Sequence, residues 1–124
     1  MCGIIGLSSN KSVSSSIINS LKKLEYRGYD SAGIATLSDG LINEVKSEGR
    51  VENLENNFDL KNLSGNIGIG HVRWATHGVP NSVNAHPHSS ENVSVVHNGI
   101  IENSTLLKKF TSSFLIKQNS PSSK

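Results

Sequence analysis

The stretch HVRWATHG, from His71 to Gly78, closes a run of alternating residues and opens a loop rich in Gly, Pro and Asn. The alternation predicts a strand from Ile67 to Trp74, with the odd-numbered residues on one face. Polar groups at the end of a strand are typical of a binding loop on a rigid scaffold. The guanidinium of Arg73 suits a planar anion such as a carboxylate, because it donates two parallel hydrogen bonds. A surface turn with an incidental ion pair is the alternative interpretation of this stretch alone.

Composition limits what kind of protein this is. With 124 residues the chain forms one domain at most, and 35% hydrophobic residues is low for a domain that buries its own core. The net charge of +2 is spread without basic runs, which disfavours nucleic acid as a partner. One cysteine and no long apolar segment favour a reducing cytoplasmic setting, with no membrane partner and no signal peptide.

Periodicity predicts the remaining elements. Apolar residues at 3–4 spacing indicate an amphipathic helix from Ser12 to Tyr26, with Ser12 as its N-cap and Gly28 as its C-terminal stop. Asp39-Gly40 indicates a tight hairpin. The other expected elements are a buried strand over 1–7, hairpin strands over 33–37 and 41–46, a short helix with Val51, Leu54 and Phe58 on one face, a loop over 78–92, a strand over 93–96, and a helix from Glu102 to Phe110 with Leu106, Leu107 and Phe110 inward.

Cys2 has two interpretations. Most free cysteines are small buried hydrophobes. The alternative uses its position, because removal of Met1 would make Cys2 the N-terminal residue. An α-amino group has a pKa of roughly 7.7–8.0, so it is partly neutral at pH 7 and could take the proton of its own thiol. Nucleophile and base would then lie in one residue.

Two polar clusters follow the central stretch. His86-Pro87-His88 could bind a metal with His71, His77 and His97, but no compact ligand pair with Cys or acidic residues is present, so hydrogen-bonded loop histidines without a metal are favoured. Asn98-Gly99 is either an ordinary turn or an oxyanion hole, in which a side-chain amide and a backbone N–H point at one atom.

Four blocks together carry a family resemblance, and the match covers about residues 2–108. They resemble the N-terminal glutaminase domain of the glutamine–fructose-6-phosphate aminotransferase (isomerizing) family, which are class II glutamine amidotransferases. The resemblance implies an α+β N-terminal-nucleophile hydrolase fold, an αββα four-layer sandwich of which this chain carries roughly the first half. The blocks are Met1 to Ile4, Glu25 to Gly33, His71 to Gly78, and His97 to Asn103.

The resemblance also implies roles for individual residues, with no cofactor and no metal. Cys2 would attack the side-chain amide of glutamine, and Asn98 and Gly99 would bind the oxyanion. Arg73 would hold the α-carboxylate of glutamine. The implied closing loop carries Trp74, Thr76 and His77, and Arg27 and Gly28 would support the nucleophile's end of the site. In the family the released ammonia goes to a sugar-isomerase domain that makes glucosamine 6-phosphate.

The chain departs from the family after the Glu102 helix. The family continues into an acidic motif whose aspartate binds the α-amino group of glutamine, whereas residues 110–124 contain no Asp or Glu. We therefore expect a partial glutaminase domain over 1–109, a divergent disordered tail over 110–124, and no sugar-isomerase domains. A truncated or frameshifted product, with a strand edge and an apolar face exposed, is the hypothesis that follows. Its function is either that of a glutaminase segment, which a second chain could complete, or that of an inactive remnant.

Overall fold

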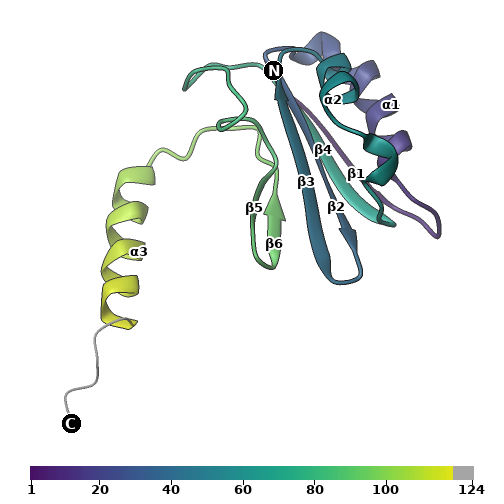
Figure 1. Cartoon of the computed structure of the whole chain (residues 1–124). Coiled ribbons are helices and arrows are strands. Elements are labelled where there is room, and N and C mark those ends of the chain that lie inside the picture. Colours follow the sequence, from purple (N-terminus) through teal and green to yellow (C-terminus); the bar gives the residue numbers. More distant parts are fainter. Residues whose placement is uncertain (119–124) are drawn as a thin grey trace.

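A four-stranded antiparallel sheet with helices against one face forms the body of the molecule in the computed structural model, which describes residues 1–118 (Figure 1). This mixed architecture confirms the predicted α+β class. The elements in chain order are β1 (Gly3–Ser8), α1 (Ser14–Leu24), the 3-10 helix η1 (Glu25–Arg27), β2 (Ser31–Ser38), β3 (Leu41–Glu48), α2 (Val51–Asn57), the 3-10 helix η2 (Leu60–Asn62), β4 (Ile67–Arg73), β5 (His88–Ser90), β6 (Val93–Val95) and α3 (Ser104–Gln118).

The strand order β1-β4-β2-β3 places the predicted central strand, β4, inside the sheet. Gly3 at the start of β1 pairs with Val72, and Ser31 at the start of β2 pairs with Arg73. The N-terminus, the end of β4 and the start of β2 therefore meet at one end of the sheet. The strand predicted over 1–7 is an edge strand rather than a buried one, since Ile4 is 44% exposed.

The core lies between the sheet and helices α1 and α2. Ile17 and Leu21 of α1 are fully buried against β4, where Gly68 and Gly70 leave room for them. A Cβ on Gly70 would lie 2.6 Å from Cγ2 of Ile17, so the helix packs directly on the strand backbone. The amphipathic pattern of α1 is thus confirmed, and its apolar stripe supplies much of the core.

Both predicted ends of α1 were wrong in detail. Val13, not Ser12, is the N-cap residue, and no side chain caps the helix there. Gly28 follows η1 in an extended conformation with φ −179°, so it is not a left-handed helix stop. Val51 and Leu54 of α2 are buried as expected, whereas Phe58, which follows the helix in an extended conformation, is 37% exposed.

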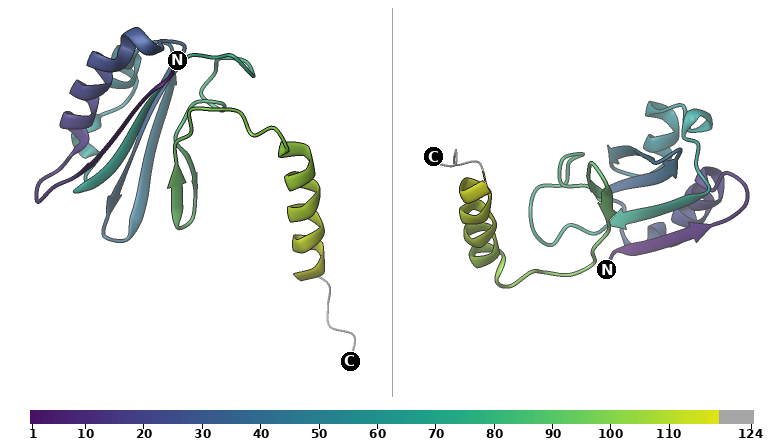
Figure 2. Two further views of the ribbon diagram at one scale, coloured as in Figure 1. Left: turned by 180° about the vertical axis from the view of Figure 1, so that it is seen from behind. Right: turned by 90° about the horizontal axis from the view of Figure 1, so that it is seen from below.

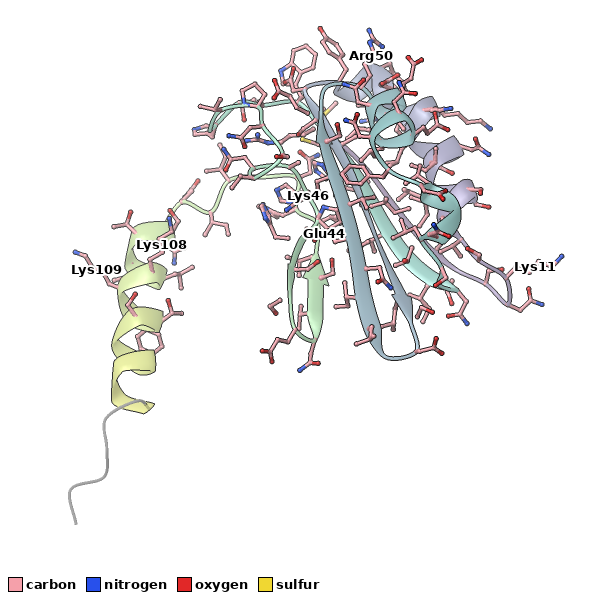
Figure 3. The ribbon with its side chains drawn as sticks, in the orientation of Figure 1. Lys11, Glu44, Lys46, Arg50, Lys108 and Lys109 are labelled. Atoms are coloured by element: carbon pink, nitrogen blue, oxygen red, sulfur yellow. The ribbon has the colours of Figure 1, made fainter. Side chains whose placement is uncertain are left out.

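The second face of the sheet carries the β5–β6 hairpin, seen beside β3 in Figure 1. Strand β5 lies within the stretch predicted as loop over 78–92. The Ser89 hydroxyl bonds Glu44 of β3, which also pairs with Lys46 at 3.0 Å, and both β3 side chains are labelled in Figure 3. The hairpin covers this face only partly, since Leu37 and Ile67 are 37% and 45% exposed.

Helix α3 lies apart from both sheets in every view (Figures 1 and 2). Leu106, Leu107 and Phe110 are 66%, 45% and 72% exposed, so the prediction that they point inward was wrong. Helix α3 also continues to Gln118, whereas a disordered tail was expected from residue 110; residues 119–124 lie outside the described chain. Within residues 1–118, none of the helices has the length and apolarity to cross a membrane.

Candidate active site

Cys2 lies just before β1, beside the residue that follows β4. The backbone N–H of Trp74 donates to Sγ of Cys2 at 3.4 Å, and the thiol lies 3.8 Å from the carbonyl oxygen of Trp74. The β1–β4 register places them together, because Gly3 pairs with Val72. The cysteine is only partly exposed, so it is neither a core residue nor a free surface thiol.

A cavity of about 300 Å³ opens in front of Cys2. Seven of the nine site residues predicted from sequence line it, although they lie far apart along the chain. They come from the N-terminus, from the end of β4 with the loop after it, and from the segment after β6. The lining residues are Met1, Cys2, His71, Arg73, Trp74, Thr76, His77, His86, His97, Asn98, Gly99 and Ile100.

The two predicted supporting residues, Arg27 and Gly28, lie behind this cavity. Nε of Arg27 donates to the Tyr26 hydroxyl at 3.1 Å, and these residues line a neighbouring cavity of about 290 Å³ with Met1 and Trp74. Gly28 is pressed against the end of β4, where an added Cβ would lie 2.4 Å from the carbonyl carbon of Arg73. The glycine is therefore required by this close approach of two backbone segments.

Arg73 organises the loop that follows β4. Its guanidinium donates to the carbonyl oxygen of His77 and, at 3.4 Å, to that of Val79. The hydroxyl of Thr76 lies 3.3 Å from Nδ1 of His77 in the same loop. The bonds from Arg73 to the two loop carbonyls use two of the five N–H donors of the guanidinium. The same side chain lines the cavity, so it shapes the loop and also has donors left for a ligand.

Asp30 is a residue that the sequence-based site prediction missed. Its carboxylate oxygen Oδ2 accepts the N–H of Ala75 at 2.7 Å, and its own N–H donates to the carbonyl oxygen of Arg73 at 3.1 Å. Asp30 thereby fixes the backbone on both sides of Trp74, which in turn holds the thiol of Cys2. The signal was present in the polar block Tyr29 to Gly33, which is too rich in functional groups for a plain connector.

Three histidine rings contact one another at the cavity, and two of them, His71 and His86, line it. The rings of His71 and His86 stack with their centroids 4.6 Å apart and their planes 26° apart, and the ring of His88 lies edge-on to that of His86 at 4.5 Å. Burial is the main cause that lowers the pKa of His71 and of His86 to about 4, so both rings are neutral at pH 7. Within residues 1–118, neither ring nitrogen of the strand residue His71 has a hydrogen-bond partner, whereas Nδ1 of the loop histidine His86 accepts the N–H of His97, as predicted for a hydrogen-bonded loop histidine. Among residues 1–118 no cluster of three or more His, Cys, Asp or Glu has metal-binding geometry.

Comparison with solved structures assigns the fold to a class. The chain superposes with a TM-score of 0.76 on the glutamine phosphoribosylpyrophosphate amidotransferase from B. subtilis complexed with ADP and GMP, at 26% identity over 97% of this chain and 26% of that one. An allosteric regulatory enzyme of purine biosynthesis matches with a TM-score of 0.78, at 26% identity over 100% of this chain and 27% of that chain. The fold is that of the class II glutamine amidotransferases, which confirms the predicted N-terminal-nucleophile hydrolase fold.

Sequence comparison narrows the class to one family. The chain is 57% identical over 115 residues to the glutamine–fructose-6-phosphate aminotransferase (isomerizing) of Clostridium acetobutylicum, covering 91% of this chain and 19% of that protein. It is 56% identical over 103 residues to the enzyme of the same name from Mesorhizobium japonicum, covering 83% and 17%. The chain belongs to the glutamine–fructose-6-phosphate aminotransferase family and spans about a fifth of the length of these relatives. No family model matches the chain.

Proposed function

We propose that this chain carries the nucleophile half of a glutaminase site, which hydrolyses glutamine to glutamate and ammonia through a Cys2 thioester. The observation that carries the proposal is the single cavity lined by Cys2, Arg73, Asn98 and Gly99. It combines a thiol, a fixed cation and a segment able to stabilise an oxyanion, and these are the parts that acyl transfer from an amide requires. The family relationship supports the same chemistry.

The reaction begins once Met1 is removed, because the α-amino group of Cys2 then becomes the base. That amine takes the thiol proton, and the thiolate attacks the side-chain amide carbon of glutamine. The Asn98 amide and the Gly99 N–H stabilise the negative oxygen of the tetrahedral intermediate. Collapse of the intermediate breaks the C–N bond while the α-ammonium of Cys2 gives its proton to the departing NH2 group, so that ammonia leaves, and water then cleaves the thioester to glutamate and the free thiol.

The loop after β4 binds the amino-acid end of the substrate in this proposal. Arg73 pairs with the α-carboxylate, and its bonds to loop carbonyls orient the guanidinium for that contact. Trp74, Thr76 and His77 cover the bound glutamine. Arg27 and Gly28 support the backbone behind the thiol, consistent with the close approach of Gly28 to β4.

We extend the proposal to the complete enzyme from the name of its relatives. The ammonia would be transferred to fructose 6-phosphate to give glucosamine 6-phosphate, in a region that corresponds to the unmatched part of the relatives. The remainder of the glutaminase domain beyond residue 109 would come from the rest of that protein or from a second chain. A reactive free thiol as nucleophile suits the reducing cytoplasm, where we expect the enzyme to work.

Intact mass after incubation with 6-diazo-5-oxo-L-norleucine, a glutamine-like electrophile, tests the proposal. The chain has one cysteine, so a thiol adduct reports on Cys2 alone. We expect a mass that lacks Met1 and carries one adduct, and no adduct on Cys2→Ser. Iodoacetamide, which needs no glutamine site, serves as the control for an accessible thiol. A chain that has lost Met1 and reacts with iodoacetamide but not with the glutamine analogue would contradict the proposal in favour of an inactive remnant.

A further inference from the structure

A short segment before β5 is embedded in the open face of the main sheet. Ala85 is fully buried, Pro87 is among the most buried side chains, and His86 lies between them facing the cavity. The backbone of His86 rests on β2 at Gly33, where an added Cβ would lie 2.2 Å from the carbonyl oxygen of His86. The segment 85–87 therefore has a fixed position on the sheet, although it belongs to no strand.

The ring of His86 packs against a side chain of β4. It stacks on His71, which is 1% exposed, with the ring planes 26° apart. In the described part of the chain no group completes a hydrogen bond to His71, although a backbone group of His97 lies near enough to raise its pKa. Besides burial, the neighbouring titratable groups Arg73, Lys46, His88 and His97 lower the pKa of His86, and Arg73 and His88 also lower that of His71. Glu44 acts on His88 in the opposite sense.

The free edge of the His86 ring reaches the segment that carries Asn98 and Gly99. Its Nδ1 accepts the backbone N–H of His97 at 3.2 Å, immediately before that pair. The ring of His97 in turn lies over Gly99, since an added Cβ there would be 2.9 Å from Nε2 of His97. A continuous series of contacts therefore links His71 to His86, His86 to His97, and His97 to Gly99.

We propose that His86 is a positioning residue, whose neutral imidazole, stacked on His71 and accepting the His97 N–H, holds the Asn98-Gly99 pair at the cavity. The catalytic consequence rests on the proposed glutaminase function. The contacts of His86 with His71 and His97 do not depend on that function, because they are observed within residues 1–118. The bond requires an unprotonated Nδ1, so His86 carries any ring proton on Nε2.

Two substitutions separate this role from simple packing. His86→Asn keeps an acceptor oxygen near the place of Nδ1 but loses the ring, whereas His86→Leu keeps apolar volume and loses the acceptor. We expect His86→Leu to lower the first-order inactivation rate of Cys2 by the glutamine analogue about 100-fold, since an error of about 1 Å in a catalytic group has that effect. The analogue's apparent binding constant should change less than about threefold, and His86→Asn should recover most of the rate. A loss equal in both variants, or none in His86→Leu, would overturn the proposal.

Amide hydrogen exchange measures the same contact without any reaction. The N–H of His97 should be protected in the native chain, lose about tenfold or more of its protection in His86→Leu, and keep it in His86→Asn. His88→Asn is the matched control, because His88 touches the same ring yet does not line the cavity, and protection of His97 should be unchanged there. Unaltered exchange of His97 in His86→Leu would refute the positioning role even if the chain fails to react. If the exchange of the His97 N–H responds to the variants as expected, but the native chain is not labelled by the glutamine analogue, only the proposed function is refuted.

Discussion

Replacing Gly28 with alanine tests whether the end of η1 and the end of β4 must touch for the site to form. Gly28 has an extended backbone that any residue adopts, so the substitution introduces no conformational strain. The new Cβ would lie 2.4 Å from the carbonyl carbon of Arg73, and 2.6 Å from its oxygen and from the nitrogen of Trp74. These are backbone atoms, which cannot rotate away as a side chain would.

The magnitude follows from that geometry. Ordinary carbon contacts begin near 3.5 Å, so the two segments must separate by about 1 Å. Overpacking of this kind lowers the free energy of unfolding by about 1–3 kcal/mol. The displaced atoms include the Trp74 N–H that donates to the thiol of Cys2. We therefore expect the labelling rate of Cys2 by the glutamine analogue to fall by about 100-fold.

Gly6→Ala is the matched control for this change. Gly6 lies on β1, and the nearest atom to an added Cβ is Cγ2 of Ile69 at 3.9 Å, an ordinary contact. Thermal unfolding followed by circular dichroism, together with intact-mass labelling kinetics, would compare both variants with the native chain. If Gly28→Ala unfolds and reacts like Gly6→Ala, the close approach does not determine the site and the reasoning fails.

Three further changes probe the same region. Arg73→Lys should weaken binding of the glutamine analogue by about tenfold or more, measured as the concentration for half-maximal inactivation, because an ammonium cannot reproduce a bidentate carboxylate contact; an unchanged value would remove Arg73 from the binding site. Asp30→Ala removes the acceptor of the Ala75 N–H and should lower the free energy of unfolding by about 1.5–3 kcal/mol in urea titrations, with slower labelling, whereas Asp30→Asn should be milder. The pKa of His71 is about 4 in the folded chain against an ordinary 6.5, so the unfolded chain binds more protons between these values, and the free energy of unfolding should fall as the pH drops from 6.5 to 4. This residue contributes a slope approaching about 1.4 kcal/mol per pH unit, and His71→Leu should remove that part of the pH dependence; parallel curves would refute it.

Local chemistry made the hairpin and the central strand predictable. Asp39 and Gly40 both have positive φ, 52° and 76°, as the tight turn inferred from that dipeptide requires. The alternation that predicted β4 depends only on neighbouring residues, and so does the spacing that predicted α1. The convergence of Cys2 with the end of β4 came from the family resemblance, because strand order is a long-range property.

Other features depend on contacts between distant segments that no local pattern encodes. Gly28 was read as a helix stop, but its role is a close approach to Arg73 from far along the chain. The prediction that α3 buries its apolar residues was wrong, because a stripe of apolar residues shows only that a helix can pack. It does not show that the chain provides a surface for the helix to pack against. Asp30 was missed because its partner is a backbone N–H, and backbone groups have no signature in sequence.

The strand order of the main sheet has a consequence for how the protein comes to be folded. Strands β2 and β3 are neighbours in sequence and close by a two-residue turn, so this pair is the quickest to form. Strand β1 and its partner β4 are separated by about sixty residues, and closing so long a loop costs more chain entropy than closing the hairpin. Cys2 cannot meet Trp74 until both strands have been made and paired, so the thiol-bearing segment stays unpaired until β4 is available. Because the contact between Cys2 and Trp74 needs this distant pairing, we expect the thiol to gain its reactive surroundings only after β4 has joined the sheet.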